Sequence, residues 1–205
     1  MRLGRRLPRS FFARSPTEVA PDLLGRVLVR VLPDGVRLAA RLVETEAYEE
    51  HDPASHSYRG RTARTEVMFG PPGHLYVYFT YGMHYCMNVV VGRDGQGAAV
   101  LLRAAEPIEG LAAMAERRGT DDARRLCSGP ARMAQAFGIE REANGTDLVG
   151  GAAMRLHEGH PVPPKAVVRT SRVGVTVGTG RPWRYIVRGD PFLSPGRPAR
   201  ITGRP

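Results

Sequence analysis

Lysine is nearly absent from this 205-residue chain: Lys165 is the single one, and every other basic residue is arginine. A mechanism that forms a Schiff base needs a lysine amine, so such chemistry has almost no candidate here. Arginine instead offers a planar fork of N–H donors that fits phosphate oxygens. The basic residues are therefore better suited to phosphate binding than to covalent amine chemistry.

Cysteines and long apolar runs are also scarce. Cys86 and Cys127 are the two cysteines, too few and too far apart to form a disulfide framework or a zinc site. No apolar run approaches the roughly 20 residues that span a bilayer. Residues 1–15 contain arginines but no apolar core of signal-peptide length. We therefore expect a protein of the reducing cytoplasm.

The charge balance is strongly positive, with a net charge of +10 and an isoelectric point near 10.5. Such a balance favours a polyanionic partner, with nucleic acid first and an acidic membrane second. A GC-rich genome that encodes arginine in place of lysine would explain the scarcity of lysine, but not the sign of the total charge.

The length and the 42% hydrophobic content predict one domain with a substantial core. In the stretch SPTEVAPDLLG, Ser15, Pro16 and Glu18 have the order of an N-cap, a first-turn proline and a capping-box partner. This order predicts a short helix. Segments 106–119 and 129–138 have helical spacing with glycine stops and predict two more helices.

Most of the remaining pattern is typical of strands. Segments 26–32 and 36–48 flank a Pro-Asp-Gly turn and predict a hairpin. After a loop at 49–73, a second hairpin rich in tyrosine is expected at 74–88. Further strands are predicted at 97–104, 152–159, 166–177 and 183–189. The fold class predicted is a single α+β domain dominated by antiparallel strands.

The chain contains no repeat and no linker that would divide it. We expect the arginine-rich residues 1–14 to form a basic flexible arm that adds salt-sensitive phosphate contacts. The segment from residue 191 is rich in proline, glycine and arginine and is expected to be loosely ordered. We assign 15–194 to the domain and 195–205 to a tail.

An acidic cluster occupies the end of the first predicted hairpin. The two-residue period of a strand places Glu44, Glu46 and Tyr48 of VETEAY on one face. A solvated strand face with ion pairs to local arginines is one interpretation, because structural networks also gather carboxylates. The other is a glutamate that faces an aromatic-walled pocket and acts as a general base on water.

A metal site is a competing interpretation of the same region. Glu46, His51, Asp52 and His56 offer the oxygen and nitrogen ligands that a metal-dependent nuclease would use. The two histidines are five residues apart in a predicted loop, a spacing that matches no metal-binding template. The sequence therefore gives this interpretation little support.

The stretch HLYVYFTYGMHYCMN, residues 74–88, contains four tyrosines, a phenylalanine and two histidines. Tyr76 and Tyr78 share one strand face, whereas Tyr81 lies beside Gly82 at the turn, where a ring has no sheet face to pack against. Exposed rings on a basic protein suit base stacking, and a rigid ring at a hairpin tip suits a wedge between base steps. Chemistry on an extruded base requires such rings and a wedge together with an acid in the pocket.

Five segments together resemble the alkyladenine (3-methylpurine) DNA glycosylase family: VETEAY, HLYVYFTYGMHYCMN, AVLLRAAEP, LCSGPARMAQAFGI and SRVGVT with WRYIVRGDPF. The resemblance covers about residues 17–194 in a consistent order. It implies an open, curved antiparallel sheet like that of the C-terminal domain of methionyl-tRNA formyltransferase, flanked by helices and carrying a protruding β-hairpin. It also implies hydrolysis of the N-glycosidic bond of damaged purines in duplex DNA, the first step of base excision repair.

The resemblance assigns catalytic roles. Glu46 matches the base that deprotonates the attacking water, and Arg103 matches the arginine that holds this water with it. Glu44 is expected to form only a structural ion pair. No cofactor or metal is implied, and without a suitably placed lysine the enzyme would be monofunctional, leaving an abasic site uncut.

The resemblance also assigns substrate contacts. Tyr48 and Tyr78 match the rings that sandwich the flipped purine, and His56 matches a histidine that hydrogen-bonds and stacks against it. Asn88 matches a pocket wall that discriminates against an exocyclic amino group. Tyr81 matches the residue that fills the gap left in the duplex, that is, the DNA-intercalating residue.

The expected substrates are 3-methyladenine and 7-methylguanine, whose positive charge makes them good leaving groups. Hypoxanthine and ethenoadenine stay open cases, because they need protonation at N7 and no second acid is evident. The expected partner is double-stranded DNA, bound by a monomer in a bacterial cytoplasm and nucleoid. Two other classes are weighed against this one: a non-catalytic binder of DNA structure, and a metal-dependent nuclease.

Overall fold

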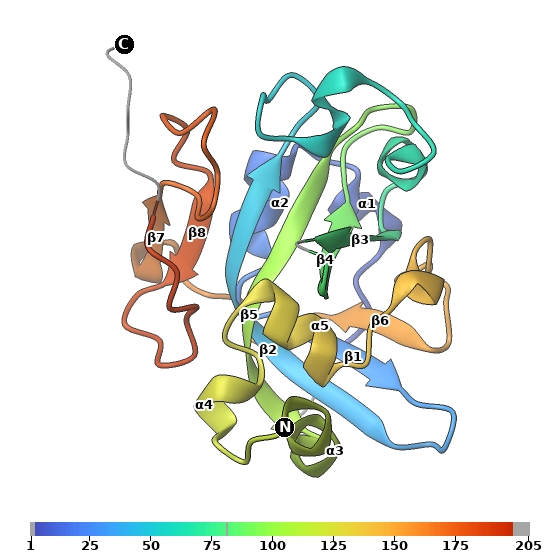
Figure 1. The fold of residues 1–205 in the computed structure, drawn as a ribbon, viewed down its shortest axis with the longest axis vertical. Coiled ribbons are helices and arrows are strands. Elements are labelled where there is room, and N and C mark those ends of the chain that lie inside the picture. The colour runs from blue at the N-terminus through green and yellow to red at the C-terminus, as the bar shows by residue number, and fades with distance from the viewer. Residues whose placement is uncertain (1–2, 81, 199–205) are drawn as a thin grey trace.

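The computed structural model describes residues 3–80 and 82–198. Its strands are β1 (Val27–Val31), β2 (Arg37–Tyr48), β3 (Leu75–Thr80), β4 (His84–Val90), β5 (Ala99–Glu109), β6 (Met154–His157), β7 (Val167–Thr170) and β8 (Arg184–Val187). Its α-helices are α1 (Arg9–Phe12), α2 (Pro16–Asp22), α3 (Leu111–Arg118), α4 (Ala123–Leu126) and α5 (Pro130–Ala136). Its 3₁₀ helices are η1 (His56–Arg59), η2 (Glu66–Phe69), η3 (Arg141–Ala143) and η4 (Pro164–Ala166). The predicted α+β class is confirmed (Figure 1).

The strands of the described residues form one antiparallel sheet, with the path β3–β4–β5–β2–β1–β6. The two longest strands, β2 and β5, run side by side through its centre (Figure 1). β5 pairs along one edge of β2, and β1 and β8 share the opposite edge, where β1 pairs with residues 37–41 and β8 with residues 44–46. β7 pairs with β8. The path ends at β3 and β6 without closing, so the open antiparallel sheet is confirmed.

The start of α2 follows its predicted capping pattern. The Ser15 N–H donates to the Glu18 carboxylate at 3.1 Å, and Pro16 occupies the first turn. The helix then packs on β2, where the Thr45 hydroxyl donates to the Ala20 carbonyl oxygen at 2.8 Å. α2 therefore covers the face of β2 toward which Thr45 points.

Apolar side chains from the central strands and from the helices form the core. Leu42 of β2, Leu102 of β5, and Met133 and Phe137 at α5 are all fully buried. Residues 42–47 of β2 are buried without interruption, because strands cover both edges of β2 and helices cover the sheet. A carboxylate on this part of β2 is removed from water and therefore requires hydrogen-bond partners.

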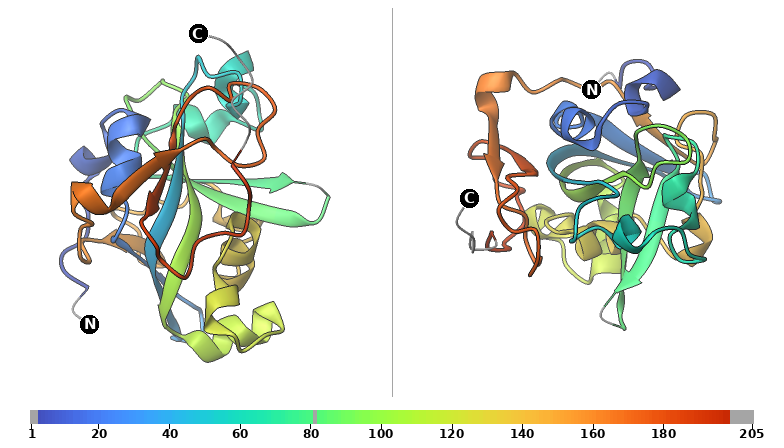
Figure 2. Two further views of the ribbon diagram at one scale, coloured as in Figure 1. Left: turned by 90° about the vertical axis from the view of Figure 1, so that its left-hand side faces the viewer. Right: turned by 90° about the horizontal axis from the view of Figure 1, so that it is seen from above.

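The hairpin β3–β4 projects away from the rest of the sheet (Figure 2). Two large apolar side chains near its end, Phe79 and Met83, are exposed. Tyr81, predicted to intercalate into DNA, lies outside the described residues.

The N-terminal segment differs from our prediction of a flexible arm over residues 1–14. Leu7 and Phe12 are buried, and the Leu7 N–H donates to the Leu156 carbonyl oxygen at 2.9 Å. The Phe12 carbonyl accepts from the Gly92 N–H at 3.0 Å. The described part of this segment is therefore packed against the domain, because its apolar side chains are buried in the core. The many arginines of the segment had suggested an exposed arm instead.

The C-terminal segment also differs from the expected loose tail. Ser194 is buried and its N–H donates to the Glu44 carboxylate at 2.7 Å, and Pro198 pairs with Val173. Residues 195–198, assigned to a tail, therefore lie against the domain. Within the described ranges, no helix has the length and apolar character needed to cross a membrane.

Candidate active site

A cavity of about 380 Å³ opens where β2, β5 and the β3–β4 hairpin meet the loop that follows β2. Its volume falls in the range of small-molecule sites and suits a single purine. All six predicted site residues that the structure describes line this cavity: Glu46, Tyr48, His56, Tyr78, Asn88 and Arg103. The fold therefore brings together side chains that are up to 57 positions apart in the chain.

Glu46 is fully buried at the cavity wall. One carboxylate oxygen accepts from the Val173 N–H at 2.8 Å, and the other accepts from the Tyr48 hydroxyl at 2.9 Å. Burial is the largest influence and raises the pKa of Glu46, while Arg103, the Val173 N–H and the Tyr48 hydroxyl act in the opposite direction. The result is a carboxylate that is more basic than usual yet still held by donors, as a general base requires.

Arg103 of β5 lies at an irregularity in the pairing of β5 with β2. Glu44 pairs with Ala104 and Thr45 pairs with Leu102, so Arg103 has no direct partner in this ladder, and the register is the same on both sides of the irregularity. Its Nε lies 2.9 Å from Glu44 Oε1 and its Nη1 lies 3.6 Å from Glu46 Oε2. One guanidinium thus faces both buried glutamates.

Glu44 forms the ion pairs that we expected of it. Besides Arg103, it accepts from Arg184 Nε at 2.6 Å and from the Ser194 N–H and hydroxyl at 2.7 and 2.9 Å. It is fully buried and does not line the cavity. Although the two-residue period places Glu44 and Glu46 on one face, only Glu46 borders the cavity.

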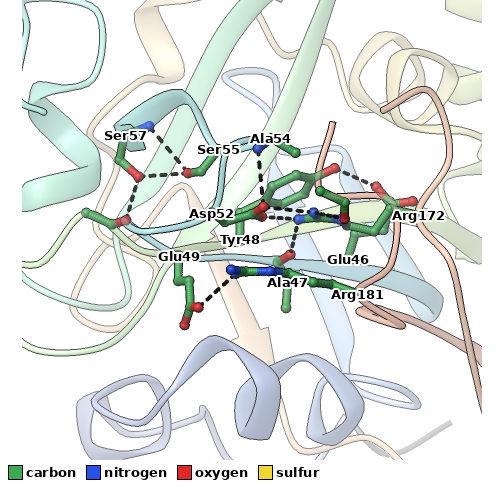
Figure 3. A network of polar contacts seen from close by, with 12 residues as sticks. Glu46, Ala47, Tyr48, Glu49, Asp52, Ala54, Ser55, Ser57, Arg172 and Arg181 are labelled. Carbon is green, nitrogen blue, oxygen red and sulfur yellow. Dashed lines mark hydrogen bonds and ion pairs between the residues drawn. The ribbon is translucent and has the colours of Figure 1, made fainter. Parts of the chain in front are cut away.

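Tyr48 is held by a buried arginine (Figure 3). The Arg172 guanidinium pairs with both oxygens of Asp52 and lies 4.6 Å from the centre of the Tyr48 ring. It also donates to the Ala47 carbonyl oxygen at 3.0 Å. Burial, followed by the charge of Glu46, raises the pKa of Tyr48 well above its usual value. Tyr48 is therefore a neutral hydroxyl donor on a fixed ring.

Three rings form the opposite side of the site. The His56 ring meets the Tyr78 ring edge-on with centroids 4.5 Å apart, and its Nδ1 lies 3.1 Å from the Tyr76 hydroxyl. Although His56 keeps an exposed surface, desolvation of its ring and the nearby Arg64 lower the pKa of His56 to about 4. The histidine is consequently neutral at pH 7, and it can donate or accept a hydrogen bond but carries no charge.

Asn88 is fixed in the cavity wall by the sheet. It lies opposite Tyr76 in the β3–β4 register, and its side-chain amide donates to the Tyr76 carbonyl oxygen at 3.2 Å. This bond, together with its near-complete burial, holds the amide in one orientation. A fixed amide can favour or reject a polar substituent on a bound base.

Sequence reasoning missed several residues of the site. Tyr76 was placed on the same face as Tyr78 but given no role, and Arg172, Val173 and Ser194 were not singled out. Cys86 is buried and also lines the cavity, and burial raises the pKa of Cys86, so it stays a thiol.

The residues proposed for a metal site do not assemble. Asp52 is paired with Arg172, His56 Nδ1 faces the Tyr76 hydroxyl, and His51 is exposed. Across residues 3–80 and 82–198, no group of three or more His, Cys, Asp or Glu side chains could hold a metal ion.

Comparison with known proteins shows which sequences this chain is similar to. The family model described as methylpurine-DNA glycosylase matches residues 10–191. A protein of Carboxydothermus hydrogenoformans named "Putative 3-methyladenine DNA glycosylase" is 48% identical over 188 residues, covering 92% of this chain and 98% of the relative. A protein of Streptomyces avermitilis with the same name is 52% identical over 196 residues, covering 93% of this chain and 92% of the relative.

Proposed function

The chain belongs to the methylpurine-DNA glycosylase family and is a DNA glycosylase, and we propose that it removes cationic methylpurines from duplex DNA as a monofunctional enzyme. The proposed substrates are 3-methyladenine and 7-methylguanine, flipped out of the duplex into the cavity lined by Glu46 and Tyr78. The name of the relatives supports the first of these bases.

The buried carboxylate of Glu46 is the observation that carries the proposal. As the C1′–N9 bond breaks, its electrons go to the departing purine and the sugar develops oxocarbenium character. Glu46 stabilises this charge and accepts a proton from the water whose oxygen bonds to C1′. Arg103, whose Nη1 lies 3.6 Å from the carboxylate, is proposed to hold the same water.

The rings of the cavity support binding of a flat cation. Tyr48 and Tyr78 are proposed to stack on the two faces of the purine, and a positively charged base gains from aromatic faces. Asn88 is proposed to reject the exocyclic amino group of normal guanine. Tyr81 is proposed to fill the gap in the duplex.

Neutral lesions demand an acid that the proposed base contacts do not supply. With its pKa lowered to about 4, His56 carries no proton to donate as a cation at pH 7. The hydroxyl pKa values of Tyr48 and Tyr78 are well above their usual range. We therefore propose that hypoxanthine and ethenoadenine are released more slowly than 3-methyladenine.

The proposal of monofunctional chemistry rests on the scarcity of lysine. Lys165 lies in η4, and the described residues around the cavity include no lysine. Without an amine to attack C1′, the expected product is an intact strand with an abasic site.

The test is single-turnover release of 3-methyladenine and of hypoxanthine from duplex DNA in EDTA, comparing wild type with Glu46→Gln. We expect release by wild type, strand breaks only after alkali, and a rate loss of about 10²- to 10⁴-fold in the variant. Tight lesion binding without release of either base would instead identify a binder of DNA structure. Cleavage that EDTA abolishes would identify a nuclease.

A further inference from the structure

Arg103 lies between two buried carboxylates but contacts them unequally. Its Nε is 2.9 Å from Glu44 Oε1, whereas its Nη1 is 3.6 Å from Glu46 Oε2. Both carboxylates are fully buried, so either would gain from a close ion pair with the guanidinium. Something in the surroundings must therefore hold Arg103 toward Glu44.

Ser194 of the C-terminal segment makes contacts that explain this preference. Its hydroxyl accepts from Arg103 Nε at 3.2 Å and donates to Glu44 Oε1 at 2.9 Å. Its N–H donates to the other Glu44 oxygen at 2.7 Å. Ser194 is buried and thus forms hydrogen bonds with both partners of the Arg103–Glu44 pair.

Gly196 brings the same segment against the guanidinium. A Cβ added at Gly196 would lie 3.0 Å from Arg103 Nη2 and 2.5 Å from Cγ1 of Val173, a distance that would force a shift. Val173 also supplies the N–H bond to Glu46 and pairs with Pro198. The segment 194–198 therefore packs against two of the groups next to the Glu46 carboxylate, Arg103 and Val173.

We propose that the segment 194–198 is part of the catalytic apparatus, with Ser194 as a positioning residue that keeps Arg103 on Glu44 and away from Glu46. The match to the family model ends at residue 191, before this segment begins. The proposal rests on the proposed role of Glu46 as general base.

The benefit of this arrangement follows from the chemistry of a base. A close ion pair with Arg103 would stabilise the charged carboxylate and weaken its ability to take a proton from water. It would also occupy the side of the Glu46 oxygen where the water must sit. Holding the guanidinium 3.6 Å away leaves the carboxylate basic and still charge-balanced.

The test compares Ser194→Ala with wild type in single-turnover release of 3-methyladenine across pH. Without the hydroxyl, Arg103 is free to move toward Glu46, so the acid limb of the pH–rate profile is expected to shift to lower pH. The rate above this limb is expected to fall about 10- to 100-fold, the loss typical of a misplaced catalytic group. Affinity for lesion-containing DNA should not change, and Ser194→Thr, which keeps the hydroxyl, should restore the wild-type profile.

Thr45→Val is the matched control, because it removes a buried hydrogen bond between the Thr45 hydroxyl and the Ala20 carbonyl oxygen, on the side of β2 that packs against α2. It should lower stability but leave the pH profile unaltered.

An unaltered pH profile in Ser194→Ala would overturn the proposal and make Ser194 merely structural. If Ser194→Ala does not fold, Gly196→Ala, which crowds the same guanidinium, decides by the same criterion. Failure of the wild-type protein to release any base would overturn the proposed function, and this result is distinct from an unaltered pH profile in Ser194→Ala.

Discussion

Replacing Asp52 by Asn would leave a charged guanidinium in the protein interior without its counter-ion. The side chains of Asp52 and Arg172 are both 0% exposed, and the carboxylate contacts both terminal nitrogens of the guanidinium. Desolvation is the largest influence on Arg172 and would lower its pKa, but the hydrogen bonds that it donates to Asp52 and the charges of nearby groups raise the pKa of Arg172 overall. Because an arginine guanidinium keeps its proton at ordinary pH even without this partner, it stays charged in the variant, and its burial becomes uncompensated.

Burial sets the size of the expected effect. Removing one partner of a buried ion pair costs about 3–5 kcal/mol of unfolding free energy, whereas an exposed pair contributes about 0–1 kcal/mol. A domain is stable by about 5–15 kcal/mol, so the loss is a large share of the total. At about 2–4 °C per kcal/mol for a chain of this size, the melting temperature should fall by about 6–20 °C.

The assay is urea denaturation followed by circular dichroism, with linear extrapolation to water. Glu109→Gln is the matched control, because Glu109 pairs with Arg37 at 2.7 Å while their side chains are 40% and 50% exposed. If Asp52→Asn loses no more than about 1 kcal/mol, like the control, the argument from burial is refuted. Because Arg172 also lies over the Tyr48 ring, base release should be measured in the same variant.

Two further predictions concern the cavity. Tyr48→Phe keeps the ring but removes the hydroxyl that donates to Glu46 at 2.9 Å. The pKa of Glu46 should therefore rise further, and the acid limb of the pH–rate profile should move to higher pH. An acid limb at the wild-type pH would contradict the assigned hydrogen bond. Tyr78→Ala should weaken binding of lesion-containing DNA by about 5- to 150-fold, the value of one base–aromatic stack, in a fluorescence anisotropy titration. An equal loss on undamaged DNA would show that the ring does not contact the flipped base.

Short-range rules predicted most elements of the fold. The order Ser15, Pro16, Glu18 gave the start of α2, and the Pro-Asp-Gly turn gave the hairpin β1–β2. The segment 106–119 was predicted as helix throughout, yet its first four residues continue β5 in pairing with β2. Local spacing was misleading there because a long neighbouring strand was available to extend the ladder.

The candidate site was predicted only in part. The two-residue period and the family resemblance identified Glu46, Tyr48 and Tyr78, and all three line the cavity. Strand alternation by itself could not separate Glu44 from Glu46, because it places both on one face, and only the family resemblance assigned them different roles. The contacts of Arg103 with both glutamates depend on the pairing register of β2 and β5, which no local pattern reveals.

The sequence by itself determined which side chains are present to bind phosphate, stack on a base and take a proton, because these abilities belong to the residues. It also determined the strands and turns, which depend on neighbours a few positions apart. Tertiary structure alone decided the environment of Glu46. Val173 and Ser194 reach the two glutamates from more than 120 positions away, and the basicity of a buried carboxylate depends on which donors surround it and how closely.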